Sequence, residues 1–517
     1  VGSGFGGSVS ALRLAEKGYK VLVVEKGKRY ASKDFPKTNW NLKKFFWMPR
    51  IFLYGIQSIT LLKNIFIFHG TGVGGGSLVY ANTLLIPPDK VFKNKSWPEH
   101  DWKEKLLPFY KKAQKMLGAV KATYEAATDT IIKDCAKSLN VEKSYHNVDV
   151  GIYFGESGKT VKDPYFNGNG PERAGCTLCG GCMVGCRYNA KNTLDKNYLY
   201  FAEKLGVEIL PEREVNDIIP LENGGYEIII RKSTGIIRPN IKLKTKKLIL
   251  SGGVLGTVKL LLKCKVKGKL GDISPKIGDF VRTNSEAIIG VKLDKTPKED
   301  FSKGIAISAG FYPDKNTHIE AVRYGKGQTV MALLTTFFPD RSIPLPGLIR
   351  WGISVISAPI KFLINLYPFD WAKKAIILLV MQPIDNYLKL DYKSRWWRMG
   401  GFSMNSKSSN GKKIPSHIPI AKTVAETITK KRPGIISTTY MDAIFNISST
   451  AHILGGACIG SDQNSGVIDG NFEVFNYPGM YVIDGSVIPS NLGVNPSLTI
   501  TAMAEYAMDR FPDKDES

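Results

Sequence analysis

Acidic residues, cysteines and long apolar runs are all scarce in this chain of 517 residues. Seven cysteines in a chain of this length exclude a disulfide framework of the kind that small secreted proteins use. No uninterrupted apolar stretch reaches about 18 residues, so we expect no single membrane-spanning helix. The sequence opens at Val1 with neither a methionine nor a signal-peptide pattern, and we expect its natural start to lie upstream.

Basic residues outnumber acidic ones. The chain has 46 Asp and Glu against 71 Lys and Arg, and its formal net charge is +25. The basic residues are scattered, and no zinc-finger, RNA-binding or helix-turn-helix pattern accompanies them, so we expect no nucleic-acid partner. Apolar residues make up 43% of the chain, which is ordinary globular usage and excludes disorder, collagen and coiled coil. The length predicts two or three domains, because single cores stop growing beyond about 250 to 300 residues.

One internal segment, residues 341–385, is unusually rich in apolar and aromatic residues. Its uncharged runs are too short to span a bilayer, and Arg350, Lys361, Lys373 and Lys374 lie along it. Basic side chains beside tryptophan and tyrosine suit the interface of an anionic membrane, where their stems stay apolar and their charged ends meet phosphate. A buried cap helix explains the same composition equally well, so both interpretations stand.

The amino terminus carries a nucleotide-binding pattern. The string GSGFGG from Gly2 predicts the turn from a first strand into a helix, and residues 19–24 predict the next strand, which ends at Glu25. Gly2 allows the tight turn, Gly4 lets the backbone approach a pyrophosphate, and Gly7 lets the helix pack on the strand. We expect Glu25 to accept the ribose hydroxyls of a dinucleotide. Only one residue of the first strand is present, so we expect that strand to be truncated.

Two further glycine clusters and the carboxyl-terminal segment add to this pattern. Residues 72–77 expose backbone amides to a ligand, and residues 252–256 turn a buried strand into a helix. Another strand is expected at residues 480–484, and a helix from Ser497 to Met508 would place its positive end where it stabilises an anionic reduced flavin. From these segments we expect ligand contacts by Gly72, Gly74, Gly75, Ser77, Gly252, Asp484, Gly485, Asn495 and Pro496.

In this order the motifs resemble those of the glucose-methanol-choline (GMC) flavoprotein oxidoreductases, and within them the branch similar to bacterial cholesterol oxidases. The shared strings run from end to end of the chain and are VGSGFGG, GVGGGSLV, SGGVLGT, TAHILGG, YVIDGS and GVNPSLTI. The resemblance implies an FAD cofactor. Covalent members carry a histidine just after the second glycine loop, where this chain has Leu78-Val-Tyr80, so we expect noncovalent FAD. The resemblance also places Val215 beside the adenine.

The resemblance implies that His452 is the active-site histidine and that Asn495 is its partner on the flavin side. An alcohol must lose its hydroxyl proton as hydride leaves carbon, and imidazole titrates near working pH, so a histidine suits the base. Asn495 can hydrogen-bond the alcohol oxygen and the flavin edge. Sterol-oxidising members also place a carboxylate near the substrate, and Glu320 is the candidate, with a surface carboxylate paired with Arg323 as the alternative.

Four cysteines, Cys176, Cys179, Cys182 and Cys186, have the C-x2-C-x2-C-x3-C spacing of iron–sulfur ligands. Arg187 replaces the proline that commonly follows, and the sequence holds no second set of cysteines. We favour a compact loop with reduced thiols and no metal over a zinc or iron–sulfur site. Reduced thiols predict a cytoplasmic protein, peripheral at the inner membrane face if the lipophilic segment docks there.

We therefore predict an α/β fold in which a Rossmann-like FAD-binding domain is interleaved with an α+β substrate domain on an antiparallel sheet. The FAD-binding domain uses residues 1–90, 170–285 and 446–517, residues 91–169 form a helical and loop insertion, and residues 286–445 form the substrate-binding domain. Strands within the substrate-binding domain are expected at residues 287–293, 330–334 and 376–381.

The predicted function is FAD-dependent oxidation of the CH–OH group of a lipophilic alcohol such as a sterol, by hydride transfer to flavin with His452 as the base. Either oxygen or an electron carrier is expected to reoxidise the flavin. One alternative is a membrane-facing dehydrogenase that passes electrons to a carrier through a metal or iron–sulfur site at residues 176–186. Another alternative is a noncatalytic lipid-binding relative with the same fold.

Overall fold

A parallel sheet is assembled from strands that lie far apart in the sequence. The computed structural model describes residues 1–98, 101–394, 401–409 and 414–514. Its parallel pairs are β1 (Leu22–Val24) with β11 (Glu208–Leu210), and β15 (Leu248–Leu250) with β25 (Met480–Val482). The Gly2 amide donates to the Val24 carbonyl of β1, and the Val1 carbonyl accepts from the residue that follows β15. The first two residues therefore connect the pairs into one Rossmann-like layer.

Helices pack closely around this layer where glycine allows it. They are α1 (Phe5–Glu16), α4 (Trp102–Met116), α6 (Tyr198–Lys204), α7 (Gly253–Val266) and α13 (Ser497–Asp509). Helix α1 lies against α6 and α13, and α13 also lies against α4. At Gly6 an added methyl group would lie 1.8 Å from the Ile483 carbonyl oxygen, so any side chain there would force α1 away from the strand segment.

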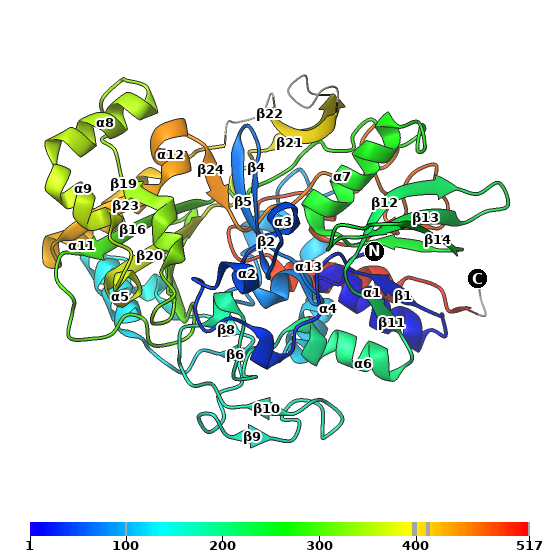
Figure 1. Cartoon of the computed structure of the whole chain (residues 1–517), viewed down its shortest axis with the longest axis horizontal. Coiled ribbons are helices and arrows are strands. Elements are labelled where there is room, and N and C mark those ends of the chain that lie inside the picture. The colour runs from blue at the N-terminus through cyan, green and yellow to red at the C-terminus, as the bar shows by residue number, and fades with distance from the viewer. Residues whose placement is uncertain (99–100, 395–400, 410–413, 515–517) are drawn as a thin grey trace.

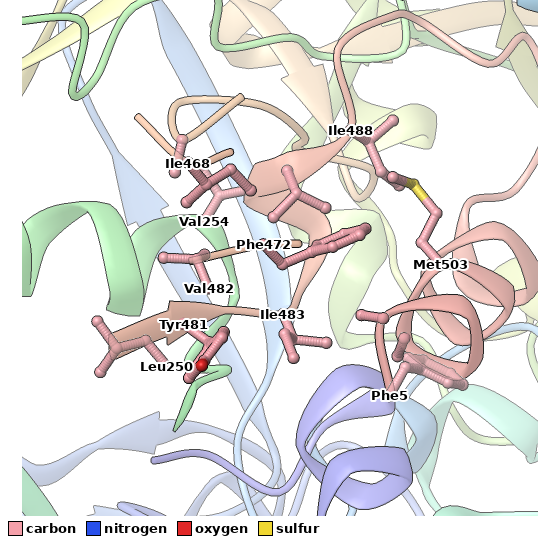
Figure 2. Close-up of a cluster of buried hydrophobic side chains, with 14 of the residues drawn as sticks. Phe5, Leu250, Val254, Ile468, Phe472, Tyr481, Val482, Ile483, Ile488 and Met503 are labelled. Atoms are coloured by element: carbon pink, nitrogen blue, oxygen red, sulfur yellow. The ribbon is translucent and has the colours of Figure 1, made fainter. Parts of the chain in front are cut away.

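An apolar core holds the carboxyl-terminal segment against these elements. Figure 2 shows Phe5 of α1, Val482 of β25 and Met503 of α13 in one cluster of buried side chains with Phe472. Phe472 is 0% exposed although it lies in a loop. Because a buried aromatic ring removes a large apolar area from water, this loop is fixed by packing.

The second lobe contains a seven-stranded antiparallel sheet with the order β19-β23-β16-β20-β18-β17-β7. Its strands are β19 (Thr335–Phe337), β23 (Gly434–Thr439), β16 (Ala287–Leu293), β20 (Ala375–Met381), β18 (Thr317–Val322), β17 (Ala309–Asp314) and β7 (His146–Asn147). Helices α5 (Ala127–Ser138) and α11 (Pro419–Lys431) contribute to a buried apolar cluster with this sheet. Strand β7 and helix α5 lie within residues 91–169, the expected insertion. The insertion therefore forms part of the sheet lobe. Figure 1 shows this lobe on the left and α1 and β1 on the right.

Smaller elements complete the two lobes. An antiparallel sheet of β12 (Arg213–Pro220), β13 (Tyr226–Lys232) and β14 (Asn240–Thr245) lies on the same side of the molecule as α1 (Figure 1). A further sheet joins β24 (Ser448–Thr450), β5 (Ile65–Gly70) and β4 (Gln57–Leu61). Other strands are β2 (Trp47–Met48), β3 (Leu53–Tyr54), β6 (Val120–Lys121), β8 (Asp149–Val150), β9 (Thr160–Val161), β10 (Arg173–Ala174), β21 (Leu388–Ser394) and β22 (Phe402–Ser408). Other helices are α2 (Leu42–Phe45), α3 (Asp89–Phe92), α8 (Gly347–Ser357), α9 (Pro359–Leu366), α10 (Trp371–Lys374) and α12 (Tyr440–Phe445).

Most of the expected elements form where the sequence predicts them. The strands expected at residues 287–293 and 376–381 are β16 and β20, and the helix expected from Ser497 is α13. The strand expected at residues 330–334 is wrong, because this apolar run forms a 3-10 helix and β19 begins only at Thr335. Short apolar runs do not distinguish a strand from a helical turn by their periodicity.

The lipophilic segment forms a bent pair of helices. Helix α9 follows α8 after a bend of 103°. In the ranges that the structure describes, no single helix is long and apolar enough to cross a membrane, whereas α8 and α9 taken together have sufficient length and apolar composition. The alternative of a buried cap helix is wrong, because Ile356 and Ile360 are 80% and 73% exposed.

Replacing Phe472 by alanine should lower the free energy of unfolding by about 3 to 5 kcal/mol, because the ring leaves a cavity in the core. The measurement is urea unfolding followed by tryptophan fluorescence. Phe445→Ala is the matched control, because this ring is 59% exposed and its removal should change the free energy by less than about 0.5 kcal/mol. Equal effects of the two substitutions would contradict the assignment of the core.

Candidate active site

A cavity of about 490 Å³ lies between the Rossmann-like layer and the antiparallel sheet. Its lining comes from the glycine turns, from β16 and β20, and from the segment that follows β24. Gly4, Gly253 and Gly256 belong to this lining, and a methyl group added at any of them would meet no heavy atom within 4 Å. The backbone at these turns is therefore open to the cavity and leaves room for a bound cofactor.

The structure brings most of the expected cofactor contacts to this cavity. Those that line it are Gly2, Gly4, Glu25, Gly75, Val215, Gly252, Asp484, Gly485, Asn495 and Pro496. Those that do not line it are Gly7, Gly72, Gly74 and Ser77. A methyl group at Gly7 would lie 2.1 Å from the Gly2 carbonyl oxygen, so Gly7 permits close packing of helix on turn. Ser77 donates to the Gly74 carbonyl at 2.7 Å, so this part of the second glycine loop is held by its own hydrogen bonds.

Glu25 follows β1 and is only 5% exposed. Its Oε2 accepts from the amide and the hydroxyl of Ser3 at 3.1 and 2.8 Å, and its Oε1 accepts from the Gly27 amide at 2.8 Å. These bonds hold the carboxylate in the cavity lining. Ribose binding by Glu25 stays a prediction.

Asp484 anchors the carboxyl-terminal part of the lining. Its carboxylate accepts from the Gly253 amide at 2.9 Å and from the Thr257 hydroxyl at 2.6 Å. Burial raises the pKa of Asp484, although its hydrogen bonds act in the opposite direction. Helix α13 begins at Ser497, which also lines the cavity, so the positive end of this helix lies beside the expected ligand.

His452 lies just after β24 and lines the cavity, with its Nδ1 3.1 Å from Oε2 of Glu286. Glu286 precedes β16, is fully buried, and accepts from the Thr450 hydroxyl at 2.7 Å. Burial lowers the pKa of His452, but the carboxylate of Glu286, helped by that of Glu320, raises this pKa above its ordinary value. Sequence reasoning missed Glu286, because its sequence neighbourhood contains no motif that links it to a distant histidine.

Glu320 and Asn495 form a second polar pair. Asn495 Nδ2 donates to Glu320 Oε2 at 3.1 Å, and among the described residues neither Asn495 Oδ1 nor Glu320 Oε1 has a hydrogen-bond partner. Asn495 lines the cavity, whereas Glu320 does not and contacts Asn495 instead. Burial raises the pKa of Glu320 to about 7. The alternative of a surface carboxylate is wrong, because Glu320 is fully buried and Arg323 pairs with Asp129 at 2.7 Å.

This arrangement suits the transfer of a proton from a bound molecule. A proton that reaches the His452 imidazole is stabilised by the adjacent carboxylate of Glu286. The unpaired Oδ1 of Asn495 is a buried acceptor at the same cavity, and such a group normally has a partner when its site is filled. The residues present therefore fit a bound cofactor and a hydroxyl-bearing ligand.

Four cysteines lie at a different cavity from the one that His452 lines. Cys176, Cys179, Cys182 and Cys186 line a second, much smaller cavity, and all are free thiols. Over the described ranges, no three His, Cys, Asp or Glu side chains are grouped so that they could hold a metal ion. Burial raises the pKa of Cys176 to about 12, which keeps this thiol protonated at neutral pH. These observations give the alternative of an iron–sulfur relay no support.

Comparisons with known proteins agree with the fold. Residues 414–504 match the model of the GMC oxidoreductases, and residues 1–44 match that of the NAD(P)-binding Rossmann-like domain. A cholesterol oxidase of Mycobacterium tuberculosis is 42% identical over 100% of this chain and 91% of its own length. A cholesterol oxidase of Acinetobacter baumannii is 41% identical over 99% of this chain and 94% of its own length. The solved structure of pyridoxine 4-oxidase from Mesorbium loti has a TM-score of 0.62 at 14% identity and covers 99% of this chain and 98% of its own.

The Rossmann-like layer, the glycine-lined cavity with its histidine, and the similarity to GMC oxidoreductases define a flavin-dependent oxidoreductase. The chain belongs to the GMC oxidoreductase family. Its similarity to the two cholesterol oxidases extends over nearly the whole chain and therefore includes both lobes.

Glu286→Gln should lower the pKa of His452, because the substitution removes the negative charge that raises it. If neutral His452 is the base, activity is lost as the pH falls through this pKa. The acid limb of the kcat/KM profile should then move to lower pH by about 1 to 3 units in the variant. Glu505→Gln, a buried carboxylate that pairs with Arg13 outside the cavity, should leave the limb in place. A limb that does not move in Glu286→Gln would contradict the role of Glu286.

Proposed function

We propose that this chain is an FAD-dependent oxidase that removes hydride from the CH–OH group of a sterol or another bulky lipophilic alcohol. The observation that carries the proposal is the position of His452, which lines the same cavity as the glycine turns and has its charge controlled by buried Glu286. The similarity to cholesterol oxidases supports the class of the alcohol.

The sheet side of the cavity suits a lipophilic substrate. Apolar side chains that line this side are Ile288, Val291, Ile307, Val322, Met331, Leu334, Trp371, Ile377 and Leu379. Transfer of a sterol from water to such a lining is favoured by about 25 cal/mol for each Å² of apolar surface that is buried. A few polar groups then fix the orientation of the hydroxyl, as in most small-molecule sites.

The polar residues have separate roles in the proposed reaction. FAD, when bound, supplies the hydride acceptor. His452 takes the hydroxyl proton of the alcohol, and Glu286 stabilises the imidazolium that results. Asn495 orients the alcohol oxygen, and its own side chain is fixed by the hydrogen bond to Glu320. Glu320 thus acts as a positioning residue for Asn495.

We also propose that oxygen accepts the electrons and that the protein works in the cytoplasm. The name of the similar enzymes, cholesterol oxidase, supports oxygen over a separate carrier. The free thiols, including Cys182 and Cys264, suit a reducing compartment. An oxygen electrode distinguishes the acceptors, because an oxidase consumes oxygen with its alcohol and a carrier-dependent dehydrogenase requires an added artificial acceptor.

The FAD should be bound noncovalently. The segment Leu78-Val-Tyr80 offers no histidine after the second glycine loop. Among the residues that the structure describes, His69 is the other histidine, besides His452, that lines the cavity. Its Nε2 is 3.0 Å from the Thr60 hydroxyl, and burial lowers the pKa of His69 to about 3. Acid precipitation of the purified protein should release the yellow chromophore into the supernatant, where chromatography identifies it as FAD. Colour retained in the washed pellet would show a covalent bond.

His452→Ala should slow reduction of the flavin by the alcohol by about 10² to 10⁴-fold, because the proton loses its acceptor. The measurement is anaerobic stopped-flow absorbance of the flavin. His417→Ala is the matched control, because His417 is not part of the cavity lining and its loss should leave the rate unchanged. Equal rates in His452→Ala and the unchanged protein would contradict the assignment of the base. If no alcohol bleached the flavin of either protein, the result would favour a noncatalytic lipid-binding protein.

A further inference from the structure

Helices α8 and α9 present an apolar surface to solvent. We name it the α8–α9 surface and define it as Leu348, Ile349, Ile353, Ile356, Ile360, Leu363, Ile364, Leu366, Tyr367 and Phe369, which are between 41% and 80% exposed. Figure 1 shows the two helices projecting from the sheet lobe at the upper left. Large exposed apolar patches on a folded protein mark interaction sites, so we expect another molecule or a membrane to cover this surface.

The charges around the α8–α9 surface indicate what kind of partner would bind there. No acidic residue lies between Asp340 and Asp370, whereas Arg350 and Lys361 lie within the two helices. Lys373 and Lys374 follow shortly after, and the chain as a whole carries a formal charge of +25. A second copy of the chain would bring like charges together, whereas an anionic lipid surface complements both the basic residues and the apolar side chains.

The helices that carry this surface adjoin elements that line the sheet side of the cavity. Trp351 of α8 donates from its indole nitrogen to the Thr336 hydroxyl of β19 at 2.8 Å. Thr335 of β19 lines the cavity, and so does Trp371 of α10, the helix that follows α9. A molecule that leaves a bilayer at the α8–α9 surface would therefore be close to the apolar lining.

A buried lysine fixes α9 to the sheet. Lys292 of β16 is 1% exposed, and its ammonium group donates to the carbonyls of Ile364, Asn365 and Tyr367 at 2.6, 3.2 and 2.8 Å. Carbonyls at a helix end have no partner within the helix, so this lysine satisfies them. The carboxyl end of α9 is thus held in place while apolar residues on its outer face remain exposed.

We propose that the α8–α9 surface docks the protein on the interface of an anionic phospholipid bilayer, from which a lipophilic alcohol enters the cavity. The passage of the alcohol rests on the proposed function, whereas the docking itself requires no turnover. Binding to vesicles and oxidation of the alcohol can therefore succeed or fail separately.

Docking is tested by sedimentation of the flavin-loaded protein with vesicles. The vesicles contain phosphatidylcholine alone or phosphatidylcholine mixed with phosphatidylserine. We expect the protein to sediment with the mixed vesicles and more weakly with the neutral ones. The triple variant Ile356→Ser, Ile360→Ser and Leu363→Ser should bind the mixed vesicles at least about tenfold more weakly, because apolar area no longer enters the interface.

The matched control is the double variant Ile236→Ser and Ile237→Ser. Both residues are 83% exposed and lie between β13 and β14. Figure 1 shows these two strands on the side of the molecule opposite α8 and α9. This variant should bind vesicles as the unchanged protein does. Equal binding by the triple variant and the control would overturn the proposal. The proposal would also be overturned if the protein did not bind vesicles and size-exclusion chromatography showed a dimer that the triple variant breaks.

A second arm measures flavin reduction by cholesterol. With cholesterol in mixed vesicles, the triple variant should be slower than the control variant, and with cholesterol delivered in cyclodextrin the two should be equal. Equal rates on vesicle-borne cholesterol would overturn delivery through the α8–α9 surface. Binding to vesicles without flavin reduction from either source would support docking and overturn cholesterol as the substrate.

Discussion

A buried carboxylate beside a partly buried imidazole is the interaction on which the site depends. A charge removed from water costs several kcal/mol unless it is paired and hydrogen-bonded. Glu286 meets this condition through His452 at 3.1 Å and the Thr450 hydroxyl at 2.7 Å. Glu286 precedes β16, an interior strand of the sheet lobe, and His452 follows β24. The pairing therefore requires that the two parts of the chain be assembled, and it couples the fold to the chemistry of the histidine.

The cavity separates three physical tasks. Backbone at the glycine turns lies close to the expected cofactor, because side chains there would occupy its space or clash with neighbouring carbonyls, as at Gly6. Side chains with controlled charge, such as His452, accept the proton in the proposed reaction. Aliphatic residues of the antiparallel sheet, such as Ile288 and Leu379, provide the apolar lining. The two lobes are interleaved in sequence, and each contributes to the same cavity. One chain therefore combines the three tasks.

Local sequence patterns predicted the nucleotide-binding part of the fold, because a glycine turn between a strand and a helix is encoded within a few residues. His452 and Asn495 came from the family resemblance and not from spacing, and the structure places both at the cavity. Glu286 could not be predicted, because its role arises only from a contact with a residue far along the chain. The wrong strand at residues 330–334 has a similar cause, since an apolar run of five residues is compatible with either a strand or a helical turn.

The most direct test of the account is anaerobic addition of cholesterol to the purified protein with its flavin bound, followed by admission of air. The visible absorbance of the flavin should be bleached as cholesterol is oxidised and should return when oxygen enters. Absorbance that stays unchanged with cholesterol, with other sterols and with long-chain alcohols, in a folded protein that retains its flavin, would contradict the central claim.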